Sequence, residues 1–176
     1  MIKILIGVVI VTVAVIATFL VLDPNIGIQS AANVTEVANT FSVTVEGEVY
    51  KEGTFTMKEG ALMSDLFEAC GGPSNNADER AYFTDAVLTK GMTYFIASKF
   101  DSSDQCSTSE VDKVNLNSDD AETLATINGI SASVANSIVT YRTENGAFST
   151  IEDILQVYGV GNATYHKIRN YVILHL

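Results

Sequence analysis

Two glycine-centred segments near the carboxyl end have the residue types needed to hold an anion. Gly129 and Gly159 lie thirty residues apart, in the strings INGISASVANSI (127–138) and VYGVGNATYHKI (157–168). In both strings an apolar and a small residue follow the glycine, and a segment with helical spacing comes next. Glycine adopts a positive φ and allows close approach to a ligand, and free N–H groups at a helix start attract anions. The pattern predicts two amide-lined corners that bind phosphate groups.

The predicted contacts belong to these corners and to the segment after the second one. Backbone amides are expected to donate from each corner, Ser133 and Asn162 to add side-chain hydrogen bonds, and two basic residues to supply charge. Contacts to phosphates position a protein on a nucleic acid and carry no sequence information. The full predicted binding set is Gly129, Ile130, Ser131, Ser133, Gly159, Val160, Gly161, Asn162, Lys167 and Arg169.

Four short helices are predicted to hold the two corners. Ser, Thr and Asn are favoured as helix N-caps because their side-chain oxygen accepts a hydrogen bond from a free amide. Acidic residues follow the first and third predicted caps, which favours the helix dipole. The expected caps are Ser118, Ser131 or Ser133, Thr150, and Asn162 or Thr164. Residues 113–176 are therefore predicted to form an all-α domain.

The preceding region, 41–100, has the pattern of a small α+β domain. Apolar and polar residues alternate over 41–45 and again over 54–57, which predicts two strands joined as a hairpin. Residues 61–70 have helical spacing and are followed by two glycines and a proline, which stop a helix. Residues 94–96 predict a closing strand.

The amino-terminal segment is strongly apolar. Residues 4–22 carry no charge, and such a run is long enough to cross about 30 Å of hydrocarbon as a helix. Lys3 before the run predicts that the rest of the chain is extracytoplasmic. A cleaved signal peptide is the alternative, although its apolar core is normally shorter. We predict a single-pass cell-membrane anchor at 1–23 and a stalk at 24–40.

A segment rich in serine and acidic residues, 101–112, is predicted to be a linker between the two domains. Cys106 lies in it, and Cys70 lies at the end of the predicted helix. Outside the cytoplasm the two cysteines could form a disulfide. Alternatively, Cys70 is a small buried apolar residue.

The charge of the chain is an objection to nucleic acid binding. The net charge is −11, whereas phosphate binders usually carry a basic excess. Most of the acidic excess lies in residues 41–112, with five basic and thirteen acidic residues. Residues 113–176 have four basic against six acidic residues. The repulsion is therefore concentrated outside the predicted binding region.

No set of residues points to catalysis. His166 and His175 are the only histidines, and neither has a partner at metal-ligand spacing. A phosphate-binding GxxxxGK[ST] loop is absent from the sequence. We therefore predict a protein that is not an enzyme and has no metal site or cofactor.

The sequence strings resemble two known modules. The glycine repeat resembles a tandem helix-hairpin-helix motif. The strings VNLNSDDAETLATINGIS and IVTYRTENGAFSTIEDILQVYGVG, within 113–172, closely match the competence DNA-receptor family, ComEA-like proteins. The strings VEGEV, KEGTFTMKEGALMSDLFEACGG and KGMTYFI, within 45–96, resemble a soluble-ligand-binding β-grasp domain, SLBB. Together with an anchor, this order matches the Gram-positive architecture of the family.

The resemblance implies a membrane-anchored receptor that binds double-stranded DNA non-specifically and passes it to a transport channel during natural transformation. The SLBB-like domain, 41–100, is expected to bind a ligand, to self-associate or to act as a spacer. Ser131, Val134 and Ala163 stand where the family often has Gly, Lys and Lys, which predicts weaker, micromolar binding. Two alternatives remain open: a helical bundle that contacts only protein, and a surface scaffold or polysaccharide-binding protein assembled through the SLBB-like domain.

Overall fold

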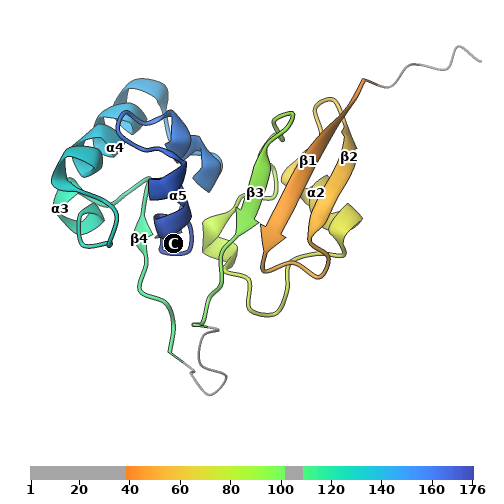
Figure 1. Ribbon diagram of the computed structural model, residues 1–176, viewed down its shortest axis with the longest axis horizontal. Coiled ribbons are helices and arrows are strands. Elements are labelled where there is room, and N and C mark those ends of the chain that lie inside the picture. Colours follow the sequence, from red (N-terminus) through yellow and green to blue (C-terminus); the bar gives the residue numbers. More distant parts are fainter. Residues whose placement is uncertain (1–38, 102–108) are drawn as a thin grey trace, which may run out of the picture. The chain divides into compact units, whose positions relative to one another are not determined.

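The computed structural model describes residues 39–101 and 109–176, which we call the β-domain and the hairpin domain (Figure 1). Both belong to the same structural unit, 38–176. The predicted anchor at 1–23 and nearly all of the predicted stalk lie outside the described residues. Within the two described ranges, no helix has the length and apolar character needed to cross a bilayer.

A three-stranded sheet is the framework of the β-domain. Its strand order is β2-β1-β3, with β1 antiparallel to β2 and parallel to β3. Val43 and Val45 alternate inward from β1 and are buried, as the period-two pattern predicts. The predicted hairpin and closing strand are confirmed. The strands are β1 (Thr40–Gly47), β2 (Gly53–Lys58) and β3 (Thr93–Ile96).

Helix α2 (Met63–Cys70) packs its apolar face into the core of the β-domain, where Leu66 belongs to the same buried cluster as residues of β1 and β3. The helix ends at Gly71, whose φ of +86° allows the predicted stop. Cys70 is a buried free thiol, and its Sγ donates to the Phe67 carbonyl oxygen at 3.6 Å. Cys106 lies outside the described residues, so the Cys70–Cys106 disulfide stays a prediction. A short 3₁₀ helix, η1 (Glu79–Ala81), lies between α2 and β3.

The hairpin domain contains helices and one small sheet. The first and last elements of the domain, β4 and β5, pair in parallel. The all-α prediction is therefore wrong at the domain ends, where Val114 and Val172 lie in strands. The third predicted helix is a 3₁₀ helix. The elements are β4 (Val114–Asn115), α3 (Ala121–Leu124), α4 (Ala132–Asn145), η2 (Ile151–Gln156), α5 (Asn162–Ile168) and β5 (Val172–Ile173).

Two of the four predicted helix caps are corrected. The first helix is capped by Asp120 instead of Ser118, and the Asp120 carboxylate accepts a hydrogen bond from the Thr123 amide at 2.8 Å. The last helix begins after Gly161, so Asn162 is its first residue and not its cap. The two confirmed caps are Ser131 and Thr150.

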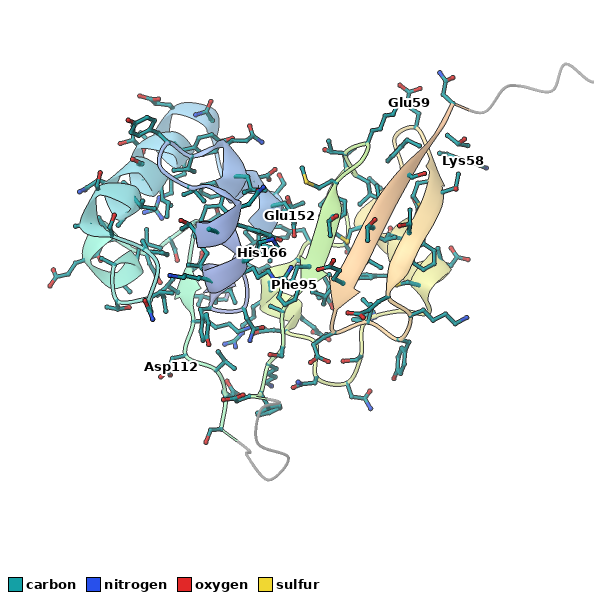
Figure 2. All side chains as sticks on the ribbon, viewed as in Figure 1. Lys58, Glu59, Phe95, Asp112, Glu152 and His166 are labelled. Atoms are coloured by element: carbon teal, nitrogen blue, oxygen red, sulfur yellow. The ribbon has the colours of Figure 1, made fainter. Side chains whose placement is uncertain are left out.

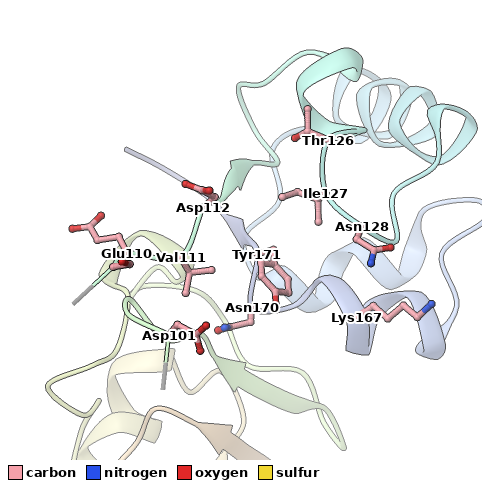
Figure 3. Close-up of a pocket in the computed structure, with 11 residues that line it drawn as sticks. Asp101, Glu110, Val111, Asp112, Thr126, Ile127, Asn128, Lys167, Asn170 and Tyr171 are labelled. Atoms are coloured by element: carbon pink, nitrogen blue, oxygen red, sulfur yellow. The ribbon is translucent and has the colours of Figure 1, made fainter. Parts of the chain in front are cut away.

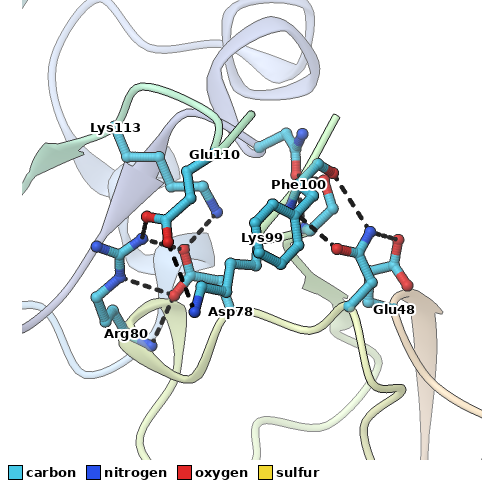
Figure 4. Close-up of polar contacts among 10 residues, drawn as sticks. Glu48, Asp78, Arg80, Lys99, Phe100, Glu110 and Lys113 are labelled. Carbon is cyan, nitrogen blue, oxygen red and sulfur yellow. Dashed lines mark hydrogen bonds and ion pairs between the residues drawn. The ribbon is translucent and has the colours of Figure 1, made fainter. Parts of the chain in front are cut away.

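Polar contacts join the β-domain to the hairpin domain (Figure 4). Lys113 Nζ lies 2.9 Å from Asp78 Oδ2, and both side chains are only 2% exposed. Asp78 also accepts hydrogen bonds from the Arg80 guanidinium at 2.9 Å. Burial alone would raise the pKa of Asp78, but Arg80 and Lys113 hold it at about 2. The Asp78 carboxylate is thus ionised at neutral pH, while burial lowers the pKa of Lys113.

The ends of the predicted linker are part of this contact. The Val111 amide donates to the Lys99 carbonyl oxygen at 3.0 Å, and Phe100 forms a bridge with Glu110. Further along, the Ser98 amide donates to Asn170 Oδ1 at 2.8 Å. The expectation of a solvated linker over all of 101–112 is therefore corrected at its carboxyl end, which is paired with the β-domain.

Candidate nucleic-acid interface

The first hairpin connects α3 to α4 and is built around Gly129. This glycine has a φ of +117°, a conformation that L side chains rarely adopt. The Ile130 amide donates to the Ile127 carbonyl oxygen at 3.0 Å, which closes the turn. Ser131 then caps α4, because its Oγ accepts a hydrogen bond from the Val134 amide at 3.3 Å. The start of α4 is exposed to solvent.

The second hairpin connects η2 to α5 and has the same backbone pattern. Gly159 has a φ of +89°, and the Val160 amide donates to the Val157 carbonyl oxygen at 3.1 Å. The cap of α5 is Gly161, which has no side chain to accept a hydrogen bond from the first-turn amides. Gly159 and Gly161 are both exposed. The repeat in the sequence is therefore a repeat in structure.

The hairpins reveal which predicted residues can donate to a ligand. The amides of Ile130 and Val160 are used inside their own turns, and both side chains are buried in the core of the hairpin domain. These two residues anchor the hairpins and are not the expected donors. First-turn amides of a helix have no intrahelical acceptor. The accessible donors are consequently the amides at the helix starts, including those of Ser133 and Asn162.

The two hairpins are held together by reciprocal packing. A Cβ at Gly129 would lie 3.0 Å from Ile168 Cγ2, in α5, and 3.4 Å from the Cβ of Lys167. A Cβ at Gly159 would lie 3.4 Å from Val134 Cγ2, in α4. Each hairpin thus rests on the helix that follows the other one. This packing fixes the spacing between the two corners and brings Lys167 beside the first.

Arg169, a member of the predicted binding set, is engaged with the β-domain. Its Nη1 lies 3.1 Å from Glu46 Oε2 in β1, and its Cζ lies 3.9 Å from the centre of the Phe95 ring in β3. An arginine placed over an aromatic ring and paired with a carboxylate is held by both contacts. Arg169 therefore attaches the hairpin domain to the β-domain, and its charge is largely neutralised by Glu46.

Lys167 is the basic side chain that the fold leaves at the hairpin surface. It is exposed at the end of α5. The other basic residues of the hairpin domain are engaged within the chain: Lys113 with Asp78, Arg142 with the carbonyl oxygens of Leu116 and Asp119, and Arg169 with Glu46. The interface therefore depends more on amide hydrogens than on positive charge.

An acidic cavity of about 620 Å³ lies beside the first hairpin (Figure 3). Asn128 and Lys167 line one side, and Asp101, Glu110 and Asp112 lie across from them. Two basic side chains form ion pairs with Glu110: Lys99 at 3.6 Å and Arg80 at 3.9 Å. The carboxylates disfavour a phosphate inside this cavity, but they do not cover the exposed starts of α4 and α5.

Glu152 is a buried acid that sequence reasoning missed. Its position in the first turn of η2 is typical of an exposed residue, yet it is only 2% exposed. Its Oε1 accepts hydrogen bonds from the Phe95 amide at 2.9 Å and from the Tyr165 hydroxyl at 2.7 Å. Figure 2 shows Glu152 between the hairpin domain and β3. Burial raises the pKa of Glu152 to about 7.

Across residues 39–101 and 109–176, no three His, Cys, Asp or Glu side chains are grouped so that they could hold a metal ion. The chemistry that the described surface offers is that of hydrogen-bond donors at two helix starts, with one lysine beside them. Such a surface suits a ligand that carries repeated anionic groups.

Comparison with known domain families assigns both domains. The model for the helix-hairpin-helix motif matches residues 109–173. The model for the SLBB domain matches residues 42–92. The matched ranges correspond to the hairpin domain and to the β-domain.

Several known proteins are similar to this chain, among them the following three. The ComE operon protein 1 of Bacillus subtilis (strain 168) is 32% identical over 155 residues, which cover 83% of this chain and 76% of that protein. An uncharacterized protein of Haemophilus influenzae is 41% identical over 63 residues, or 35% of this chain and 56% of that protein. The endonuclease/exonuclease/phosphatase family domain-containing protein 1 of Mus musculus is 37% identical over 60 residues, or 34% of this chain and 10% of that protein.

Proposed function

The chain belongs to the ComEA-like competence DNA-receptor family, and we propose that it binds double-stranded DNA non-specifically, through the phosphate backbone, during DNA uptake. Each hairpin is positioned to hold one stretch of backbone. Backbone amides of the protein contact groups that every DNA sequence carries, so the expected affinity is independent of base sequence.

The observation that supports this proposal most is the reciprocal packing of Gly129 and Gly159 against α5 and α4. It keeps two exposed helix starts at a fixed spacing. Such an arrangement suits a ligand that has two sugar–phosphate backbones side by side. A single hairpin would offer only a few amides, whereas two rigidly connected hairpins bind as one bivalent unit.

The distribution of charge predicts a weak, moderately salt-dependent interaction. Each neutralised phosphate releases a counterion and contributes about 0.9 to the slope of log affinity against log salt. Lys167 is the exposed lysine beside the hairpins, so we expect a shallow slope. Micromolar affinity is typical of such non-specific binding, and several copies on one surface would raise it.

The remaining parts of the proposal concern location and partners. We place the chain in the cell membrane through a single-pass anchor at 1–23, with both domains outside the cytoplasm, where it delivers DNA to a transport channel. Self-association through residues 41–100 fits the position of β2 at the edge of its sheet, because an edge strand has unpaired amide and carbonyl groups. We propose no catalytic activity.

Titration of the full chain with fluorescent duplexes of unrelated sequence tests the proposal. We expect similar affinities for all the duplexes, weaker binding at higher salt, and a marked loss when Gly129 and Gly159 are both replaced by alanine. No measurable binding to any duplex, or undiminished binding by the double variant, would overturn the proposal.

A further inference from the structure

Tyr158 is the most exposed tyrosine of the described chain and lies at the tip of the second hairpin. It is 89% exposed, whereas its neighbour Val157 is buried. A tyrosine usually buries much of its ring, because the ring contributes a large apolar area. Tyr158 directly precedes Gly159, where the turn has a positive φ. The fold therefore presents an exposed aromatic ring beside one of the two predicted phosphate-binding corners.

A groove of about 520 Å³ begins at Tyr158 and follows the outer face of α4. Its volume is within the range of small-molecule sites. Ser133, a member of the predicted binding set, lines the groove at its hairpin end, and Glu144 and Asn145 line it at the other end. The residues between them are Asn136, Ser137, Thr140, Tyr141 and Gln156.

The two walls of the groove are held in place. Tyr141 OH lies 3.1 Å from Gln156 Oε1, which connects α4 to the end of η2. The Tyr141 ring is stacked on Phe148, with 5.1 Å between ring centres. At the hairpin end, Gly159 rests on Val134. The groove is therefore formed before any ligand arrives.

The chemistry of the groove suits a nucleobase better than a phosphate. Glu144 is the one charged residue among those that line it, so an anion meets a negative and no positive side chain there. The amide nitrogens of Asn136 and Asn145 donate to carbonyl oxygens of their own helix, at 2.8 and 3.0 Å. The other lining groups are hydroxyls and the Gln156 amide, which both donate and accept hydrogen bonds, and the Glu144 carboxylate, which accepts them. Nucleobases have amino groups that donate and a flat face that stacks on an aromatic ring.

We infer that this groove binds an unpaired nucleobase from the DNA strand held at the second hairpin, with Tyr158 stacked on the base. A base inside an intact duplex is already stacked on its neighbours, so only a frayed, bulged or overhanging base can enter. The inference rests on the proposed function, and it adds a preference for duplex DNA with an unpaired end.

The test compares dissociation constants of the full chain for two DNAs: a short blunt duplex, and the same duplex with unpaired cytidines at one end. Stacking on a protein aromatic ring predicts that the wild type binds the second DNA at least about fivefold more tightly. Tyr158→Ala should abolish the difference, and Tyr158→Phe should keep it. Tyr50→Ala is the matched control, because Tyr50 is 63% exposed in the β-domain and its loss should leave the preference unchanged.

Failures of the two proposals are distinguishable. If the wild type binds neither DNA, the proposed function fails and this inference with it. If the wild type binds both DNAs equally, or if Tyr158→Ala keeps the preference for the unpaired end, the inference fails while the receptor function stands. Tyr158-dependent binding to a soluble N-acetylglucosamine oligosaccharide, without any preference for unpaired DNA, would also overturn it.

Discussion

The carboxyl group of Glu152, in the hairpin domain, accepts a hydrogen bond from the backbone amide of Phe95, in the β-domain, at 2.9 Å. The same oxygen accepts the Tyr165 hydroxyl at 2.7 Å. A titratable group thus lies at the contact between the two domains. Because burial raises the pKa of Glu152 to about 7, its charge state changes close to neutral pH.

Glu152 is predicted to make stability depend on pH. Its pKa rises from an ordinary value of 4.5 to about 7 in the folded chain. Between these values the folded state binds more protons than the unfolded state, so the free energy of unfolding falls as pH rises through this window. The expected loss is roughly 3 kcal/mol, at about 1.4 kcal/mol for each pKa unit. Above about pH 7 this contribution is constant.

The Glu152→Gln variant should be less sensitive to pH, because the amide oxygen still accepts both hydrogen bonds and does not titrate. Urea unfolding at about pH 5 and about pH 8 measures the difference. Glu122→Gln is the control, since Glu122 is exposed in α3. An unchanged pH slope in Glu152→Gln would show that another group controls the pH dependence.

Alanine at either hairpin glycine should weaken DNA binding by more than its effect on folding explains. The positive φ at Gly129 and Gly159 costs an L residue about 1–2 kcal/mol, and a Cβ at Gly129 also meets Ile168 at 3.0 Å. Gly60→Ala is the matched control: Gly60 has a φ of +79° and open space around its Cβ, in the β-domain.

Thermal unfolding and DNA titration on all three glycine variants separate the two effects. The two hairpin variants should lose DNA affinity, and Gly60→Ala should lose only stability. If Gly60→Ala reduced DNA affinity equally, the effect of the hairpin glycines would be assigned to general destabilisation.

Lys167 and Arg169 should respond differently to substitution, although both are basic residues near the end of the chain. Lys167→Ala should weaken DNA binding for all sequences and lower the salt slope by about 1. Arg169→Ala should leave the salt slope nearly unchanged, because Glu46 already neutralises Arg169. It should instead lower the stability by on the order of 1 kcal/mol, through the lost contacts with Glu46 and Phe95.

Affinity measured over a range of salt concentrations distinguishes these two substitutions. Lys90→Ala serves as the control for loss of an exposed lysine, since Lys90 lies in the β-domain. A larger drop in salt slope for Arg169→Ala than for Lys167→Ala would contradict the assignment of Arg169 to the domain contact.

Replacing only one member of the Asp78–Lys113 pair should lower the stability of the fold strongly. Asp78→Ala leaves the Lys113 ammonium buried without its counter-charge, and such a change typically costs about 3–5 kcal/mol. The double variant Asp78→Ala, Lys113→Met removes the isolated charge and should recover part of the loss. Equilibrium unfolding of the wild type, the single variant and the double variant measures this. Equal losses in both variants would mean that the charge is not the cause.

Local patterns in the sequence predicted much of this fold, because they reflect local physics. Alternation over 41–45 predicted β1, and the repeat around Gly129 and Gly159 predicted both hairpins with their positive φ. Some of the wrong predictions concern long-range contacts. Arg169 pairs with Glu46, 123 residues away, and no local signal marks such a partner.

Other errors arose where two local signals compete or are too short. Ser118 and Asp120 both suit an N-cap, and only the structure shows that Asp120 is the one used. The two-residue strands β4 and β5 are too short to show a period. The burial of Glu152 follows from the packing of η2 against β3, which connects residues 57 positions apart.

The pairing of β4 with β5 also has a consequence for how this module is used in evolution. Because the first and last strands of the hairpin domain lie side by side, the chain enters and leaves the module at neighbouring points. A domain with neighbouring ends can be inserted into a surface loop of another protein without forcing the two ends of that loop apart. The same pair of hairpins can therefore occur in proteins that differ in size and chemistry.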